Sequence, residues 1–443
     1  MKKRAAGTLL LALLTLAGSP AHALLEMSES GATRFESPAT AKETPFSEKL
    51  RAGHEALRKL DYPRAEALFN EAAQINPQSP LPALGHAESA RIRNLPDDVR
   101  KWLKQALDIA PKSADALTAW GRWQYAQKNY PEAEKAWKAA IAADARAAIP
   151  LVDLGDLNYN VRHNIDVAAD FYRRALQINP KLGGAHYALG TIWLDKKAPD
   201  KAIREFEESA RLSPGNPLPQ HGLGRAHQMQ QSYKAAHAAY DRALTTNADY
   251  YPARLAKGDV FLAQGEVKQA VGEYQAVARA QPKLYDAQLK LGMAQQQAGQ
   301  LREAQAAYQA AVRLNPDLPL PYNNMAWMAA SDPANKPSDA VLEWARKAVA
   351  LAPKVGDFQD TLGWVHFKRG ESAEAIKVLE KVSHAEGRQS AGVHYHLGSA
   401  YAAAGRTRDA VTAFKTALKL DPNFAEAGDA KAQLAKLEGS AKP

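Results

Sequence analysis

The chain has 443 residues, of which 46% are hydrophobic, so it is long enough to bury an extensive core. It contains no cysteine, which excludes disulfides, thiolate nucleophiles, zinc–thiolate sites and the acylated anchor of bacterial lipoproteins. The formal charge of +9 is interspersed with acidic residues and includes no run of five cations, a pattern that does not favour binding to nucleic acid.

The N-terminus has the three parts of an export signal. Three basic residues at positions 2–4 precede a short apolar run, and residues 21–23 read Ala-His-Ala, a small-x-small cleavage pattern. The alternative is a membrane anchor, but the run is well short of the roughly 20 apolar residues that a spanning helix needs. We expect a signal peptide over residues 1–23, cleavage after Ala23 and export, most simply into a bacterial periplasm. No later segment is long and apolar enough to span a membrane.

The next segment, residues 24–45, is rich in Ser, Thr, Glu and Pro and is expected to form a flexible leader. Residues 46–425 instead repeat with a period close to 34 residues. Each repeat has a glycine or alanine at the same place, which we call the marker position. The markers are Gly53, Ala87, Gly121, Gly155, Gly190, Gly224, Gly258, Gly292, Ala326, Gly363 and Gly398.

Three further positions recur after the marker. A second small residue follows about twelve residues later, a ring or leucine comes four residues after that, and a proline closes most units. Small residues let two helices approach closely, the large side chain fills the volume beside them, and proline ends the second helix. The large side chains are Phe69, Leu103, Trp137, Phe206, Tyr240, Tyr274, Tyr308, Leu379 and Phe414.

This pattern resembles the tetratricopeptide repeat. In residues 397–422, "LGSAYAAAGRTRDAVTAFKTALKLDP", the matching residues are Leu397, Gly398, Tyr401, Ala410, Phe414, Ala417 and Pro422. The resemblance implies an all-α fold, a right-handed superhelical solenoid of about eleven helix-turn-helix units over residues 46–425. Helical pairs of this kind bury their apolar faces by stacking on their neighbours.

Two segments depart from the regular period. The step from Ala326 to the next marker is 37 residues, and it predicts an enlarged turn over residues 331–338 inside the ninth unit, with no domain boundary. Residues 426–443 are expected to form a capping helix and tail, because Ala427, Ala430, Leu434 and Leu437 make one apolar stripe.

Catalytic motifs are not found. There is no His-Glu-x-x-His zinc motif, no Walker loop and no dinucleotide fingerprint. His394 and His396 are two residues apart, so on a helix they point in different directions and are not expected to hold one metal ion. The sequence predicts neither an enzyme nor a cofactor or metal site.

Recognition by the helical surface is therefore the expected activity. In proteins that this chain resembles, the first helix of each unit lines a concave wall, and a Lys/Asn clamp grips a terminal carboxylate. At the corresponding places the first three units have Leu50 and His54, Leu84 and Glu88, and Thr118 and Arg122, so the clamp is absent.

The last three units are richer in aromatic residues. Asn323 and Trp327 of one unit correspond to Asp360 and Trp364 of the next, with Phe367 and Tyr395 nearby; these six residues are the candidate concave-groove binding site. Rings beside polar groups suit a peptide or a sugar face. The alternative is that the rings only pack neighbouring helices together.

Residues 322–353 and 360–382 also resemble the last repeats of bacterial envelope proteins of exopolysaccharide biosynthesis and export. The resemblance implies a non-catalytic periplasmic scaffold whose partners are other envelope proteins or peptides, with polysaccharide as a further candidate partner. The alternative function is a general peptide- or protein-binding adaptor for outer-membrane or peptidoglycan assembly.

Overall fold

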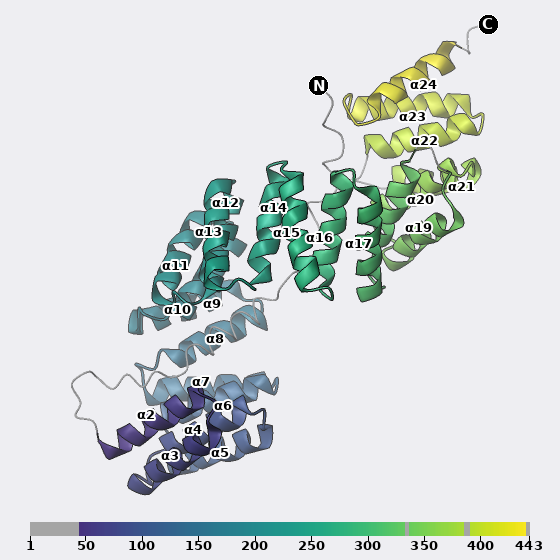
Figure 1. The fold of residues 1–443 in the computed structure, drawn as a ribbon. Coiled ribbons are helices and arrows are strands. Elements are labelled where there is room, and N and C mark those ends of the chain that lie inside the picture. The colour runs from purple at the N-terminus through teal and green to yellow at the C-terminus, as the bar shows by residue number, and fades with distance from the viewer. Residues whose placement is uncertain (1–43, 333–335, 385–389, 440–443) are drawn as a thin grey trace. The chain divides into compact units, whose positions relative to one another are not determined.

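The computed structural model describes residues 44–332, 336–384 and 390–439, and every regular element in these ranges is an α-helix (Figure 1). The 23 helices of the described part form eleven consecutive pairs, α2/α3 to α22/α23, and a final helix, α24. The predicted all-α fold of about eleven helical units with a capping helix is confirmed. The predicted signal peptide lies outside the described residues, as does all of the predicted leader except its last two positions.

The chain divides between Tyr250 and Tyr251 into two compact units. The first unit contains α2 Pro45–Arg58, α3 Tyr62–Ile75, α4 Leu81–Ile92, α5 Pro96–Ile109, α6 Ala114–Ala126, α7 Tyr130–Ala143, α8 Ile149–Asn160, α9 Ile165–Ile178, α10 Gly183–Asp195, α11 Pro199–Leu212, α12 Pro217–Met229 and α13 Tyr233–Thr246. The second unit contains α14 Tyr251–Ala263, α15 Val267–Ala280, α16 Tyr285–Gln297, α17 Leu301–Leu314, α18 Pro319–Ala330, α19 Asp339–Leu351, α20 Gly356–Lys368, α21 Ser372–Ser383, α22 Ala391–Ala403, α23 Thr407–Leu420 and α24 Ala427–Gly439.

In ten of the eleven pairs the turn between the helices contains a described residue with a left-handed backbone, and the two compact units differ in the residue type used there. In the first unit the residue with positive φ is never glycine: Leu60, Asn94, Lys128, His163, Lys197 and Gln231. In the second unit it is Gly265, Gly299, Gly370 or Gly405, and no atom lies within 4 Å of the place where their Cβ would be. Those glycines therefore serve the backbone conformation, which costs other residues about 1–2 kcal/mol.

The marker glycines have a different purpose, because a large side chain of the second helix packs directly on them. A Cβ added at Gly53 would lie 2.5 Å from the Phe69 ring, and one added at Gly85 in the next pair would lie 2.6 Å from the same ring. The ring is thus enclosed by its own first helix and by the first helix of the following pair. This contact holds together the pair and the stack.

The fourth pair follows the same rule through a residue that the sequence pattern missed. Tyr172 on α9 is fully buried, and its ring lies 2.6 Å from a Cβ added at Gly155. It comes 17 residues after the marker, whereas Phe69 comes 16 residues after its marker. The loop before α9 contains the extra residue, so a fixed spacing passes over this ring.

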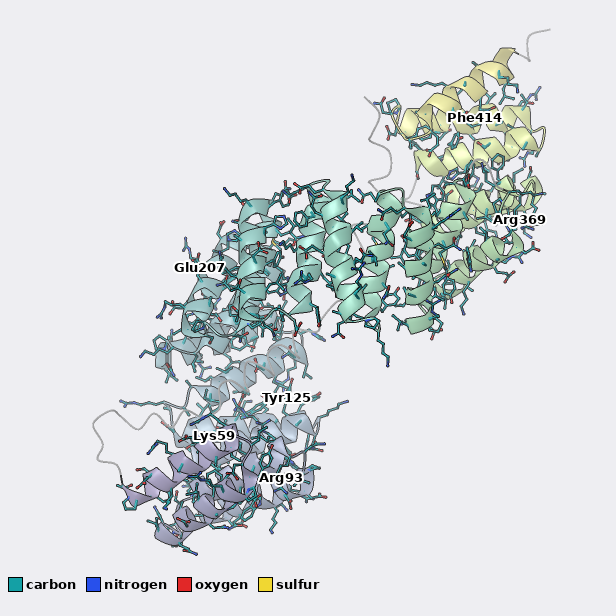
Figure 2. All side chains as sticks on the ribbon, in the orientation of Figure 1. Lys59, Arg93, Tyr125, Glu207, Arg369 and Phe414 are labelled. Atoms are coloured by element: carbon teal, nitrogen blue, oxygen red, sulfur yellow. The ribbon has the colours of Figure 1, made fainter. Side chains whose placement is uncertain are left out.

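The enlarged turn of the ninth pair lies between α18 and α19, and α19 begins at Asp339, directly after the predicted turn. Arg369, at the end of α20, ties the described part of this turn to the next pair (Figure 2). Its guanidinium donates to the Pro337 carbonyl at 3.0 Å, to Asp339 at 2.8 Å and to Glu371 at 2.8 Å. The turn is therefore an insertion within the stack.

The last helix, α24, covers the final pair as the apolar stripe predicted. Ala427 and Ala430 are buried, and Leu434 and Leu437 pack against the core around Phe414. The cap is also held by polar contacts, with the Tyr395 hydroxyl donating to Asp429 at 2.8 Å and Lys415 pairing with Glu438 at 2.8 Å.

We expect Gly292→Leu to destabilise the second unit, because a Cβ there would lie 2.7 Å from the Tyr308 ring. The overpacking should cost about 1–3 kcal/mol or more. Gly272→Ala is the control: nothing lies near its Cβ position on α15, and it should gain about 0.5–1 kcal/mol. Urea unfolding gives both values, and hydrogen exchange should locate the loss in α16, α17 and their neighbours. Equal loss of protection throughout the second unit would contradict this quasi-independent behaviour.

Arg369→Met should lower the melting temperature by a few degrees at pH 7, since three acceptors of Arg369 lose their donor. Hydrogen bonds from Arg369 first and His366 second hold the pKa of Glu371 below its usual range. Stability from this group is therefore present above the unfolded pKa of about 4.3 and lost as pH falls through the lower folded pKa. Melting curves should show the difference between variant and wild type shrinking below pH 4. Arg346→Met, which removes an exposed pair with Glu343 on α19, should have little effect at any pH.

Candidate functional site

The six residues of the predicted site lie on the first helices of the last three pairs. Asn323 and Trp327 are on α18, Asp360, Trp364 and Phe367 are on α20, and Tyr395 is on α22. Trp327, Trp364 and Phe367 are half-buried, whereas Asn323 and Tyr395 are buried. The spacing of four residues from Asn323 to Trp327, and from Asp360 to Trp364, places each polar group one turn before its tryptophan.

A residue outside the predicted set, His396, connects the two tryptophans. Its ring centre lies 4.2 Å from that of Trp364 and 5.7 Å from that of Trp327. The Nδ1 atom of His396 is 2.8 and 3.0 Å from the two carboxylate oxygens of Asp360. Because a carboxylate only accepts, Nδ1 donates, and Asp360 thereby orients the imidazole against Trp364. We call Trp327, Trp364, Phe367, Tyr395 and His396 the aromatic cluster.

Trp364 is the centre of the aromatic cluster. It stacks on Phe367 with ring centres 4.9 Å apart, and its ring lies 6.0 Å from Tyr395. The Lys368 ammonium is 5.6 Å from the indole centre, within the range of a cation–π interaction. Trp364 therefore has both a packing role and a partly accessible face.

Tyr395 serves the cap. It is buried, it contacts Phe414 and Phe424, and its hydroxyl donates to Asp429 of α24. Burial, together with this hydrogen bond to a carboxylate, raises the pKa of Tyr395 well above its usual value. These contacts favour the packing interpretation for this one residue of the predicted set.

Asn323 has an acceptor that no described side chain or backbone group uses. Its side chain is buried and donates weakly to Asn324 at 3.5 Å, while Asn323 Oδ1 has no hydrogen-bond partner among the described residues. A buried acceptor left unpaired costs about 1–3 kcal/mol. This oxygen is buried, so it is a local cost of the fold and no surface for a ligand.

The arrangement offers partly accessible aromatic faces beside the half-buried Asp360 carboxylate, with no nucleophile activated by a base. Within the described residues, no three His, Asp or Glu side chains gather as a metal-binding group. His396 is buried and faces Asp360, whereas the Nε2 atom of His394 lacks a hydrogen-bond partner, so the two histidines have separate surroundings. Such a surface can stack on and hydrogen-bond to a ligand.

The sequence contained a signal for His396 that was not used. His396 is two residues before its marker, and Trp364 is one residue after the marker of the preceding unit. Residues at these two places face each other in neighbouring pairs, as the 4.2 Å ring contact shows. Repeat phase alone could therefore have paired them.

The repeated helical pairs define a class of protein: repeat scaffolds. Models of the tetratricopeptide repeat match residues 118–182, 221–284, 286–317 and 366–434. These segments together are about half of the chain. The chain belongs to the tetratricopeptide repeat family.

Similar proteins are distant in sequence. Anaphase-promoting complex subunit 3 of Schizosaccharomyces pombe is 22% identical over 251 residues, which are 55% of this chain and 36% of that protein. The probable UDP-N-acetylglucosamine–peptide N-acetylglucosaminyltransferase SPINDLY of Hordeum vulgare is 25% identical over 181 residues, 38% of this chain and 19% of that protein. The chain thus spans about a third of the first relative and about a fifth of the second.

Among solved structures, the Cut9–Hcn1 hetero-tetramer of the anaphase-promoting complex is similar over 89% of this chain and 96% of that chain, with 15% identity and a TM-score of 0.45. Pseudomonas aeruginosa pilF is similar over 55% and 95% of the two chains, with 19% identity and a TM-score of 0.40. Tetratricopeptide-repeat proteins bind other proteins or peptides, and their fold is typical of non-catalytic scaffolds. None of the helices that the structure describes is long and apolar enough to cross a membrane.

Proposed function

We propose that the chain is a periplasmic scaffold that holds a segment of a partner protein at the aromatic cluster. The observation that carries the proposal is the placement of two half-buried tryptophans on neighbouring pairs, both in contact with the His396 ring. An extended peptide offers N–H donors and apolar side chains at regular intervals. Trp327 and Trp364 would stack on two of these side chains.

The proposed location and pathway rest on the sequence. Residues 1–23 favour export, and the resemblance of the ninth and tenth units to envelope proteins favours a role in exopolysaccharide synthesis or export. The second candidate is an adaptor for outer-membrane or peptidoglycan assembly, which uses the same surface with different partners. A glycan is a further candidate ligand, since a sugar face also stacks on tryptophan.

Truncating the tryptophans separates binding from packing. We expect Trp327→Ala, whose ring has an imidazole neighbour at 5.7 Å, to cost little stability. Trp364→Ala should cost more, because three rings lose a contact. Trp137→Ala is the reference for a core tryptophan. Trp137 is 2% exposed, so this substitution should lower the free energy of unfolding by about 3–5 kcal/mol.

Binding is measured with the full chain as bait in envelope extract of the source bacterium, with partners quantified by mass spectrometry. The Trp327→Ala variant should lose at least one partner about tenfold, the scale of a lost aromatic anchor worth roughly 1–3 kcal/mol. Capture of glycosyltransferases or export subunits would support the exopolysaccharide role, and capture of assembly factors the second candidate. Unchanged capture of every partner, with stability losses close to that of Trp137→Ala, would leave only packing.

Export has its own test. Cell fractionation followed by N-terminal mass spectrometry should find a mature chain in the periplasm that begins at Leu24. The three basic residues at positions 2–4 should be absent from it. An intact Met1 in the cytosol would refute both the signal peptide and the periplasmic location.

A further inference from the structure

At three junctions, neighbouring pairs contact each other at the same two repeat positions. The residue directly after the marker of one helical pair faces the residue two positions before the marker of the next pair. Three such contacts involve polar or aromatic side chains: Arg122 with Asp153 at 2.8 Å, Asp259 with Lys290 at 2.6 Å, and Trp364 with His396 at a ring distance of 4.2 Å. The first of these contacts lies in the compact unit that ends at Tyr250, and the other two lie in the compact unit that includes Tyr251 and the residues after it.

Two aspartates at the position after the marker have the same local arrangement. Asp156 accepts a hydrogen bond at 2.6 Å from the Tyr172 hydroxyl, and Asp259 accepts one at 2.6 Å from the Tyr274 hydroxyl. Each tyrosine is the buried ring of the second helix in the same pair. Each ring also packs on the marker glycine that precedes its aspartate.

The arrangements differ in the residue that the next pair supplies. Lys290 extends from α16 with its ammonium 5.8 Å from the Tyr274 ring centre and 2.6 Å from the Asp259 carboxylate. The equivalent residue beside Asp156 is Ala188 on α10, which is buried in the same apolar cluster as Tyr172. A methyl group brings no charge. Within the described residues, no cationic nitrogen forms an ion pair with Asp156.

The described groups around Asp156 affect its pKa, and none of them supplies the cation that Lys290 supplies to Asp259. The pKa of Asp156 is raised to about 7, mainly by burial; the Tyr172 hydrogen bond lowers this pKa, the neighbouring Asp153 raises it and Arg122 lowers it. Arg122 is already engaged by Asp153 through two contacts at 2.8 and 3.0 Å. Tyr125, labelled in Figure 2, is a neighbour of Asp156. The pKa of Tyr125 is raised to about 12, first by burial and second by the Asp156 carboxylate.

We propose that Asp156 is a binding site for a basic side chain, a lysine or arginine, of a partner protein. The ligand's cation would take the place beside Asp156 that Lys290 takes beside Asp259, with Tyr172 fixing the carboxylate. Tyr125 and Tyr159, both half-buried, lie on the same first-helix surface and would flank the ligand's methylenes. Asp156 lies in the compact unit that ends at Tyr250, whereas the aromatic cluster lies in the other compact unit. This proposal therefore does not depend on the function proposed for the aromatic cluster.

The test begins with a random dodecapeptide phage library selected on the full chain and counter-selected on Asp156→Asn. We expect the recovered peptides to share a lysine or arginine. One synthetic peptide, with its termini blocked, is then measured by fluorescence anisotropy together with a version in which norleucine replaces the basic residue. Norleucine keeps the four-carbon chain of lysine but lacks the ammonium, so the norleucine peptide should bind at least tenfold more weakly, as expected for a lost charge-assisted hydrogen bond.

Three variants make the comparison specific. Asp156→Asn removes the charge, and Ala188→Lys supplies the chain's own cation, so each should weaken the peptide at least tenfold. Lys290→Ala removes the internal cation from Asp259 and should create a second site for the same peptide. Trp327→Ala should leave the binding unchanged, so failure of this proposal and failure of the proposed function give different results.

Two results would overturn the proposal. One is a selection that recovers no peptide whose binding depends on Asp156, or recovers such peptides without enrichment of lysine or arginine. The other is equal binding to wild type, Asp156→Asn and Ala188→Lys. Melting curves of each variant accompany the measurements, and Asp156→Asn keeps the test valid where Ala188→Lys fails to fold.

Discussion

The contact between a marker glycine and a large ring is the interaction on which the rest of this structure depends. Phe69 packs on Gly53 of its own pair and on Gly85 of the next pair, and Phe206 packs in the same way on Gly190 and Gly222. Adding one methyl group would place two atoms closer than van der Waals contact allows. The repeated contact keeps successive pairs in phase, so equivalent residues meet at the junctions of α6 with α8, α14 with α16 and α20 with α22.

Because the junctions are equivalent, the chain can change the chemistry of a position without changing the fold. The residue after the marker is an arginine, an aspartate or a tryptophan in different units, and its partner changes with it. Each pair contacts its neighbours, so the effect of such a change stays local. This separation of scaffold from surface is why binding must be argued from individual side chains.

The candidate site was only partly predictable. Its positions followed from repeat phase, because phase determines which helix face a residue occupies. The orientation of His396 against Asp360, the use of Tyr395 by the cap and the unpaired oxygen of Asn323 did not, because they depend on side chains that are distant in sequence. The predicted set therefore contains one residue committed to packing and lacks one that connects the two tryptophans.

The sequence by itself determined the helical pairs, their number, the enlarged turn of the ninth pair and the capping helix. These features depend on local patterns of small, large and helix-ending residues, and such patterns are visible at short range. Only the tertiary structure decided which side chains meet across the junctions. There, one extra loop residue moved Tyr172 out of the expected spacing without moving its ring, and Ala188 left Asp156 without the lysine that Asp259 has. The physical reason is that burial and ion pairing are properties of two helices at once, whereas a repeat pattern describes one.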